Sequence, residues 1–183
     1  MATCRPGRPG ISEIAPHAKV YVDLVPEGDI DDTLSLNLEE TIRILDPVED
    51  RYATEFAYAP GKWTIKQMIG HLIDTERIFA YRALRIARGD TTPLPGFEQD
   101  DYVKTAGSND RPLTDLIAEL RCVRQSTLML LRAFPPEAWM RTGRVNDWNL
   151  SVRGIIFTTA GHELHHAAIL RERYLQPVNR ASA

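Results

Sequence analysis

The chain has 183 residues, of which 43% are hydrophobic and 26% are charged. This length and composition indicate a single globular domain with a full hydrophobic core. The net charge of −3 argues against a generally basic nucleic-acid-binding protein, and two cysteines are too few for a disulfide framework. No apolar run approaches the ~20 residues that cross a membrane, and the N-terminus lacks the apolar core of a signal peptide. We therefore expect a cytoplasmic protein without a membrane or nucleic-acid partner.

Residues 1–30 predict a flexible N-terminal tail or extension. Proline and glycine are frequent in the first ten residues, and a short apolar patch at 20–25 could lie on the domain surface. His17 follows Pro16 in this segment, and we interpret it as a bystander. The domain itself is expected at residues 31–178, with a short tail at 179–183.

Two amphipathic helices are predicted in the first half of the domain. The first runs from about Thr33 to Leu45 and ends at Asp46-Pro47, because the residue before proline is driven out of the helical region. An irregular connection, residues 48–61, follows. The second helix is capped by Thr64, with Gln67 completing a capping-box pattern, and runs to about residue 88, before a glycine.

The connection at residues 89–111 is the longest in the chain, although residues 98–105 could form a short helix. It is long enough to travel back along a helix of about 25 residues, roughly 35–40 Å, so that the second and third helices could run parallel. Long connections inside a compact domain are usually functional or crossovers. We expect residues 91–109 to form the wall of a substrate site.

Two further helices are predicted in the second half. The third begins near Pro112 and ends before Pro135-Pro136, and the fourth is capped by Ser151. A second connection, residues 137–150, lies between them. No strand pattern of comparable strength occurs in the sequence. We predict an all-α fold, a four-helix bundle with a long crossover between its second and third helices.

Three histidines fall on the predicted inward faces of two helices. His71 lies on the second helix, whereas His162 and His166 are four residues apart on the fourth and therefore share one face. Burying three imidazoles without partners would cost several kcal/mol, and one divalent metal ion satisfies all three. Three neutral imidazoles suit Zn²⁺, Ni²⁺, Co²⁺ or Fe²⁺ and leave a coordination position open for water or a thiol.

The same stretch also matches the H-E-x-x-H pattern of zinc proteases, with Glu163 as the prospective general base. Neither the downstream histidine of metzincins nor a strand-framed cleft is evident, and only 17 residues (183 − 166) follow His166. We therefore disfavour a protease. Glu163 stays a weak catalytic candidate beside the alternative of a solvated helix glutamate. His165 lies about 100° around the helix from His166, and we expect it at the bundle edge rather than on the metal.

Three segments together resemble the DinB/YfiT-like superfamily of metal-binding bundles. They are residues 61–72 (GKWTIKQMIGHL), 95–100 (PGFEQD) and 162–166 (HELHH), within a match covering about residues 34–176. The resemblance implies an up-down-down-up bundle, often a homodimer, and a metal triad of His71, His162 and His166. Members include metal-dependent hydrolases and enzymes that transfer a low-molecular-weight thiol such as bacillithiol or mycothiol, or use one in isomerisation. Residues 167–170 are Ala-Ala-Ile-Leu here, where many members carry glycine and glutamine.

Three functional hypotheses remain at this point. The first is an enzyme in which a metal ion, zinc or nickel foremost, activates a low-molecular-weight thiol or water against a small-molecule substrate. The second is a non-enzymatic, stress-associated module in which the metal only stabilises the bundle. The third, nucleic-acid binding, rests on the arginine row 82, 85 and 88, which we interpret instead as a solvated helix face.

Overall fold

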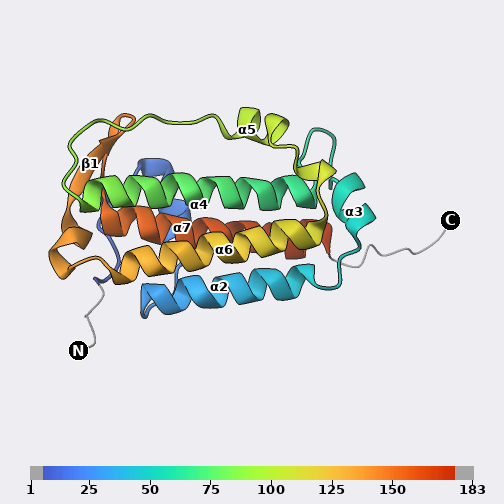
Figure 1. The fold of residues 1–183 in the computed structure, drawn as a ribbon, viewed down its shortest axis with the longest axis horizontal. Helices are drawn as coiled ribbons and strands as arrows, with labels where there is room; N and C mark the ends of the chain where they lie inside the picture. The colour runs from blue at the N-terminus through green and yellow to red at the C-terminus, as the bar shows by residue number, and fades with distance from the viewer. Residues whose placement is uncertain (1–5, 176–183) are drawn as a thin grey trace.

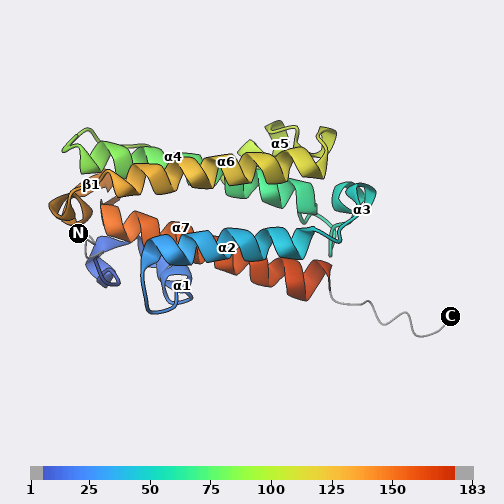
Figure 2. The same cartoon turned by 60° about the horizontal axis from the view of Figure 1, so that its bottom comes forward.

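The computed structural model describes residues 6–175, so that Cys4 and the tail expected at 179–183 lie outside the described residues. Four long helices form the bundle: α2 (Ile30–Leu45), α4 (Ile65–Ala87), α6 (Leu113–Arg132) and α7 (Val152–Ile169). Helices α4 and α6 form one layer and α2 and α7 the other (Figure 2). In Figure 1, α2 and α7 run from left to right, whereas α4 and α6 run from right to left. The mostly helical bundle expected from the sequence is confirmed.

Several helix ends lie where local sequence signals place them. The Thr64 hydroxyl accepts a hydrogen bond from the Gln67 backbone N–H at 3.1 Å, and the Gln67 side chain accepts one from Thr64 N–H at 2.9 Å. The Ser151 hydroxyl caps α7 by accepting from Gly154 N–H at 2.9 Å. Helix α4 ends before Gly89, whose φ of +79° lies in the left-handed region that favours glycine. These contacts satisfy backbone groups that a helix end leaves unpaired.

The connections contain more structure than the sequence indicated. Helix α3 (Asp50–Glu55) interrupts the segment expected to be irregular, and α5 (Gln99–Thr105) is the short helix anticipated in the crossover. Strands β1 (Thr142–Val145) and β2 (Trp148–Ser151) form an antiparallel hairpin whose turn contains Asn146 at φ +53°. Four-residue strands are too short to show a reliable alternation of polar and apolar residues, so the sequence pattern does not reveal them. The hairpin holds the crossover, because Leu94 N–H donates to Arg144 O and Asn146 N–H to Leu94 O, both at 2.9 Å.

The N-terminal segment differs most from its expectation as a flexible tail. It contains short helical turns at Ile11–Glu13 and Pro16–Ala18 followed by α1 (Lys19–Val22), which contacts α7 (Figure 2). Its buried residues include Ile14, Ala15, Ala18, Val22 and Val25. A Cβ at Gly161 would lie 1.9 Å from Tyr21 O, and one at Gly154 would lie 2.3 Å from Glu13 O. Glycines seven residues apart on α7 therefore make room for the backbone of this segment.

The core consists of two apolar clusters with a buried polar layer between them. One cluster gathers near the hairpin and the N-terminal segment, and the other near α3 and the end of α7. The polar layer includes the three histidines together with Glu76, Arg124 and Glu163. No helix among residues 6–175 is long and apolar enough to span a bilayer.

Candidate metal centre and its cavity

The three predicted histidines meet inside the bundle. His71 comes from α4, and His162 and His166 come from successive turns of α7; their side chains are 4%, 7% and 8% exposed. His162 Nε2 lies 3.0 Å from His71 Nε2 and 3.1 Å from His166 Nε2. One nitrogen of each ring falls within 4.8 Å of the others. The structure thus brings together every residue that the helical faces selected.

All three imidazoles are held neutral. Burial lowers the pKa of His71 to about 4 and the pKa of His166 to about 3, and it lowers the pKa of His162 well below its usual range. For His162 and His166, repulsion between protonated neighbouring histidines would add to this effect. A neutral imidazole has a free lone pair, which is the form that binds a metal ion.

The donor set fits a divalent transition-metal ion. An ion about 2.0–2.1 Å from each nitrogen would hold neighbouring nitrogens about 3 Å apart, which is the separation of His162 Nε2 from each of the other two Nε2 atoms. His71 Nδ1 lies 3.4 Å from the Thr75 hydroxyl, one turn further along α4, which leaves Nε2 as the free donor atom. His166 Nδ1 is buried and has no hydrogen-bond partner among the described residues. Two of the rings are also held by aromatic contacts, His71 by Trp63 and His162 by the edge of Tyr21.

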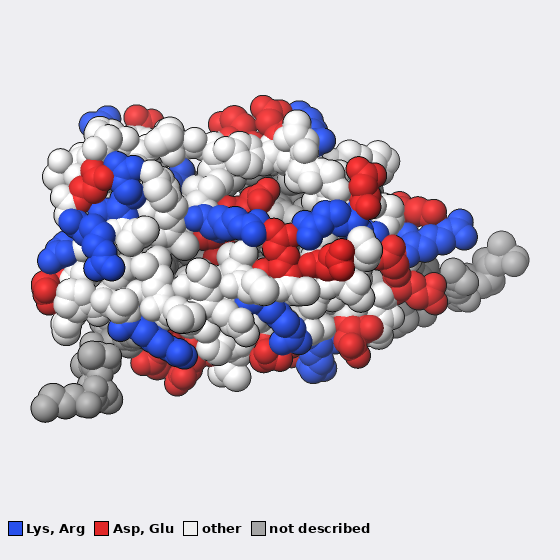
Figure 3. Space-filling view, in the orientation of Figure 1, with Lys and Arg blue, Asp and Glu red and all other residues white. Residues whose placement is uncertain are grey.

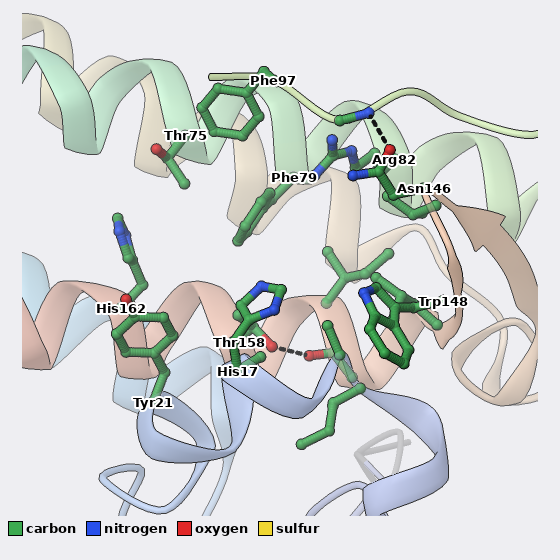
Figure 4. Close-up of a pocket in the computed structure, with 18 of the residues that line it drawn as sticks. His17, Tyr21, Thr75, Phe79, Arg82, Phe97, Asn146, Trp148, Thr158 and His162 are labelled. Carbon is green, nitrogen blue, oxygen red and sulfur yellow. Dashed lines mark hydrogen bonds between the residues drawn. The ribbon is translucent and has the colours of Figure 1, made fainter. Parts of the chain in front are cut away.

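A cavity of about 360 Å³ reaches His71 and His162 from the hairpin side. Its walls come from segments far apart in sequence: residues 14–21, the α4 face from His71 to Arg82, residues 96–99, the hairpin, and α7. In Figure 4, Phe79, Phe97 and Arg82 lie opposite His17 and Tyr21, with Trp148 at one end. The cavity is lined mainly by apolar and aromatic groups with a few polar ones, which is typical of small-molecule sites. Residues 96–99 belong to the expected substrate wall.

A second cavity of about 320 Å³ lies on the other side of the histidines. It reaches His166 and is lined by Tyr58, Lys62, Trp63 and Asp100, among others. Gln99 lines both cavities, at the start of α5. The three histidines are therefore approached from two sides, by walls that have Gln99 in common.

Glu163 and His165 are placed away from the point where the three rings meet. Glu163 is 2% exposed, so the expectation of a solvated glutamate is wrong, but its carboxylate binds Arg124 and the Thr41 hydroxyl. It lines neither of the two cavities described above. His165 is partly buried, and its ring packs against Tyr21 at 5.3 Å, in agreement with a position at the bundle edge.

Two sequence interpretations need correction. His17 is not a bystander, because it lines the cavity from the N-terminal segment (Figure 4).

The three arginines at positions 82, 85 and 88 do not form a solvated row either. Arg82 is buried in the cavity wall, Arg85 pairs with Asp90, and only Arg88 is exposed. On the face seen in Figure 3, acidic and basic side chains are interspersed. The feature that suggested nucleic-acid binding is therefore absent from the described structure.

The sequence matches the DinB superfamily over residues 33–170. It is 26% identical over 143 residues to the "Putative metal-dependent hydrolase OB0413" of Oceanobacillus iheyensis, covering 76% of this chain and 79% of the relative.

Two solved structures share the fold. One is YfiT from Bacillus subtilis, described as a probable metal-dependent hydrolase with an unusual four-helix bundle topology; the TM-score is 0.69 at 16% identity, over 90% of this chain and 89% of YfiT. The other is a mycothiol-dependent maleylpyruvate isomerase, with a TM-score of 0.67 at 15% identity, over 83% of this chain and 63% of the isomerase. At these identities the likeness concerns the fold alone. The family match covers most of the chain, and the protein belongs to the DinB superfamily.

Proposed function

We propose that this protein is a metal-dependent enzyme in which His71, His162 and His166 hold one divalent transition-metal ion, zinc or nickel foremost. The ion would serve either S-transfer from a low-molecular-weight thiol or hydrolysis of a small molecule. The observation that carries the proposal is the convergence of three buried imidazoles, two of which line a cavity large enough for a small molecule. When bound, such an ion supplies a Lewis acid that lowers the pKa of a thiol or water at its open position.

The residues around the three histidines would contribute to the site in different ways. Thr75 and Trp63 orient the His71 ring, and Tyr21 packs against the His162 ring. Residues 14–21 and the crossover form part of the cavity wall and would contact a bound substrate. Glu163 has no role at the reacting atoms in this proposal, because both of its oxygens are engaged by Arg124 and Thr41.

The non-enzymatic alternative is a bundle in which the metal only stabilises the fold. A structural zinc site is normally closed by four protein ligands, whereas the described residues bring three together here. The presence of a cavity that reaches two of the three histidines further favours an open, reactive site. A fourth protein ligand in a metal-bound structure, or a cavity that binds no small molecule, would favour the alternative.

Metal content is the first test. Elemental analysis of protein purified without chelator should find about one transition-metal ion per chain, as expected for a single three-histidine site. His162→Ala should abolish it, whereas His165→Ala, a histidine on the same helix outside the triad, should retain it. No metal in the wild type, and no uptake on adding Zn²⁺ or Ni²⁺, would remove the basis of the proposal.

Activity is the second test. Metal-loaded protein is incubated with a panel of low-molecular-weight thiols and the electrophile monochlorobimane, and separately with ester and amide substrates. Metal-dependent conjugation or hydrolysis that His162→Ala loses supports an enzyme. Full metal loading without any turnover would favour the non-enzymatic module.

A homodimer is a further part of the proposal, supported by the family resemblance. Light scattering after size-exclusion chromatography of the full chain tests it, and the mass of a single chain at micromolar concentration would contradict it.

A further inference from the structure

Arg82 occupies an unusual position in the cavity wall. It lies on the same face of α4 as His71, Thr75 and Phe79, at successive spacings of four, four and three residues. Its side chain is only 7% exposed, yet it lines the cavity that reaches the histidines. Figure 4 shows its guanidinium beside Phe79 and Asn146, on the opposite side of the cavity from His17. Arg82 therefore places a positive charge inside a largely apolar space.

No described residue neutralises this charge. The Arg82 side chain donates one hydrogen bond, from Nη2 to Pro95 O at 2.6 Å, and its guanidinium carbon lies 5.6 Å from the Phe79 ring and 5.7 Å from the Phe97 ring. Among residues 6–175 no carboxylate forms an ion pair with it. The other buried arginine of the bundle, Arg124, binds two glutamates instead. A guanidinium has five N–H donors, so most of the Arg82 hydrogen-bonding capacity is unused.

The other titratable groups of the cavity leave the positive charge of Arg82 uncompensated. The titratable side chains of its lining are His17, Tyr21, His71, Arg82, Glu98 and His162. Glu98 is the single carboxylate among them, and it is exposed to solvent and unpaired with Arg82. A buried cation without a counter-ion is costly, and the aromatic rings offset only part of that cost. A bound anion would supply the missing partner.

The length of the cavity limits the shape of that anion. His71 and Arg82 are eleven residues apart on one helix, which corresponds to roughly 16 Å between their Cα atoms. The side chains of both residues lean towards the N-terminus of the helix, and the arginine is the longer of the two, so the span between the guanidinium and the imidazole is roughly 10–15 Å. Phe79 and Phe97 line the space between. The fitting ligand is therefore elongated, with an apolar middle.

We propose that Arg82 binds the carboxylate of the substrate, and that the substrate is an elongated small molecule with a carboxylate at one end and its reacting group at the histidines. The statement about the reacting end rests on the proposed metal-dependent function. The choice of a carboxylate follows from the planar guanidinium, whose paired N–H groups match two carboxylate oxygens.

The test measures binding to metal-free protein, so that it does not depend on turnover. The probes are phenylacetate, 4-phenylbutyrate and 6-phenylhexanoate, each compared with its neutral amide of the same shape by isothermal titration. For at least one chain length the wild type should bind the carboxylate about 10- to 100-fold more tightly than the amide, the range of a charge-assisted hydrogen bond. Arg82→Gln should abolish this difference, and Arg82→Lys should retain part of it. Arg88→Gln, the same substitution at an exposed arginine just after the end of α4, should behave as the wild type.

Equal binding of carboxylate and amide, no binding of any probe at millimolar concentration, or a preference that survives Arg82→Gln would overturn the proposal. If Arg82→Gln does not fold, nuclear magnetic resonance of the wild-type protein takes the place of that variant. The signal followed is the Arg82 Nε–H resonance, which is assigned as the one that Arg82→Lys lacks. That resonance should shift with the carboxylate and not with the amide, and its failure to shift would be equally decisive. His162→Ala should lose the metal but keep the carboxylate preference, so that failure of the metal site and failure of the Arg82 site are distinguishable.

Discussion

Glu163 binds Arg124 in the buried layer of the bundle, with Glu163 Oε2 2.7 Å from Arg124 Nη2. The same guanidinium also holds Glu76 through two hydrogen bonds of 2.8 Å. Burial, followed by the charge of Glu76, raises the pKa of Glu163, whereas Arg124 and Thr41 oppose that rise. Successive residues on a helix point about 100° apart, so the residue after His162 leaves the metal centre and meets α6 and α2. The glutamate of the protease-like pattern therefore connects helices.

Replacing this glutamate should affect stability instead of metal binding. In Glu163→Gln the buried Arg124 loses one of its two carboxylates, and the free energy of unfolding should fall by about 2–4 kcal/mol. Urea denaturation measures the loss, and elemental analysis should find the metal content unchanged. Glu172→Gln, exposed beyond the end of α7, is the control and should change neither. Unaltered stability together with lost turnover would restore Glu163 as a catalytic candidate.

Gly161→Ala should detach the N-terminal segment from α7. The new Cβ would lie 1.9 Å from Tyr21 O, a backbone atom, so the segment must move away. We expect a destabilisation of about 1–3 kcal/mol, the usual cost of overpacking, and faster protease cleavage within residues 6–25. Gly7→Ala in the same segment is the control, because nothing lies within 4 Å of its added Cβ. Equal cleavage rates for the two variants would contradict the docking described here.

The attachment of the same segment should weaken in acid. Glu13 and Arg153 are joined by two hydrogen bonds of 2.7 and 2.5 Å, and this contact foremost lowers the pKa of Glu13 from 4.5 to about 2. Because the pKa is depressed in the folded state, the stabilisation is present above about pH 4.5 and is lost as the pH falls towards 2.

This acid dependence can be measured by comparing wild type with Glu13→Gln. The variant should be about 1–3 kcal/mol less stable near neutral pH, and the difference should shrink below pH 4.5. Urea denaturation at several pH values gives both curves. Glu27→Gln removes an exposed partner of Arg8 and should differ little from wild type at any pH. A difference for Glu13→Gln that persists unchanged to pH 3 would rule out the ion pair as its cause.

Metal addition should raise the melting temperature of protein stripped with chelator. A ligand at 100 times its dissociation constant stabilises the folded state by about 2.7 kcal/mol. Differential scanning calorimetry with Ni²⁺ or Zn²⁺ should therefore give a clear upward shift in wild type and His165→Ala. His71→Ala lacks one nitrogen donor and should show little shift. An equal shift in His71→Ala would place the bound ion elsewhere on the chain.

The long helices and the convergence of the three histidines could be predicted from the sequence, because both depend on local periodicity. Thr64, Gln67 and Ser151 mark helix starts through contacts within four residues, and His162 and His166 face the same way for geometric reasons alone. The boundary of α2 was less accurate: it begins at Ile30, three residues earlier, because Asp29 caps it by accepting from Asp31 N–H at 2.8 Å.

The cavity residues that could not be predicted from the sequence are placed by contacts between segments that are distant in the chain. His17 and Tyr21 reach the cavity only because α1 packs on α7, and a single turn of helix has no periodicity to reveal this. Gly154 and Gly161 are the sequence features that could have indicated this packing, since glycine inside a helix often marks a close backbone approach. Arg82 resembled a solvated arginine because the loop that covers it, held by the hairpin at Leu94 and Asn146, is remote in sequence.

The cavity wall is built largely from short segments outside the four long helices: residues 14–21, residues 96–99 and the hairpin. The three histidines, in contrast, all stand on α4 and α7. Substitutions in those short segments would therefore alter ligand selectivity while the metal-binding scaffold kept its geometry. In the proposed enzyme, most of the wall that would select the substrate therefore lies outside the helices that would hold the metal, with Arg82 on α4 as an exception.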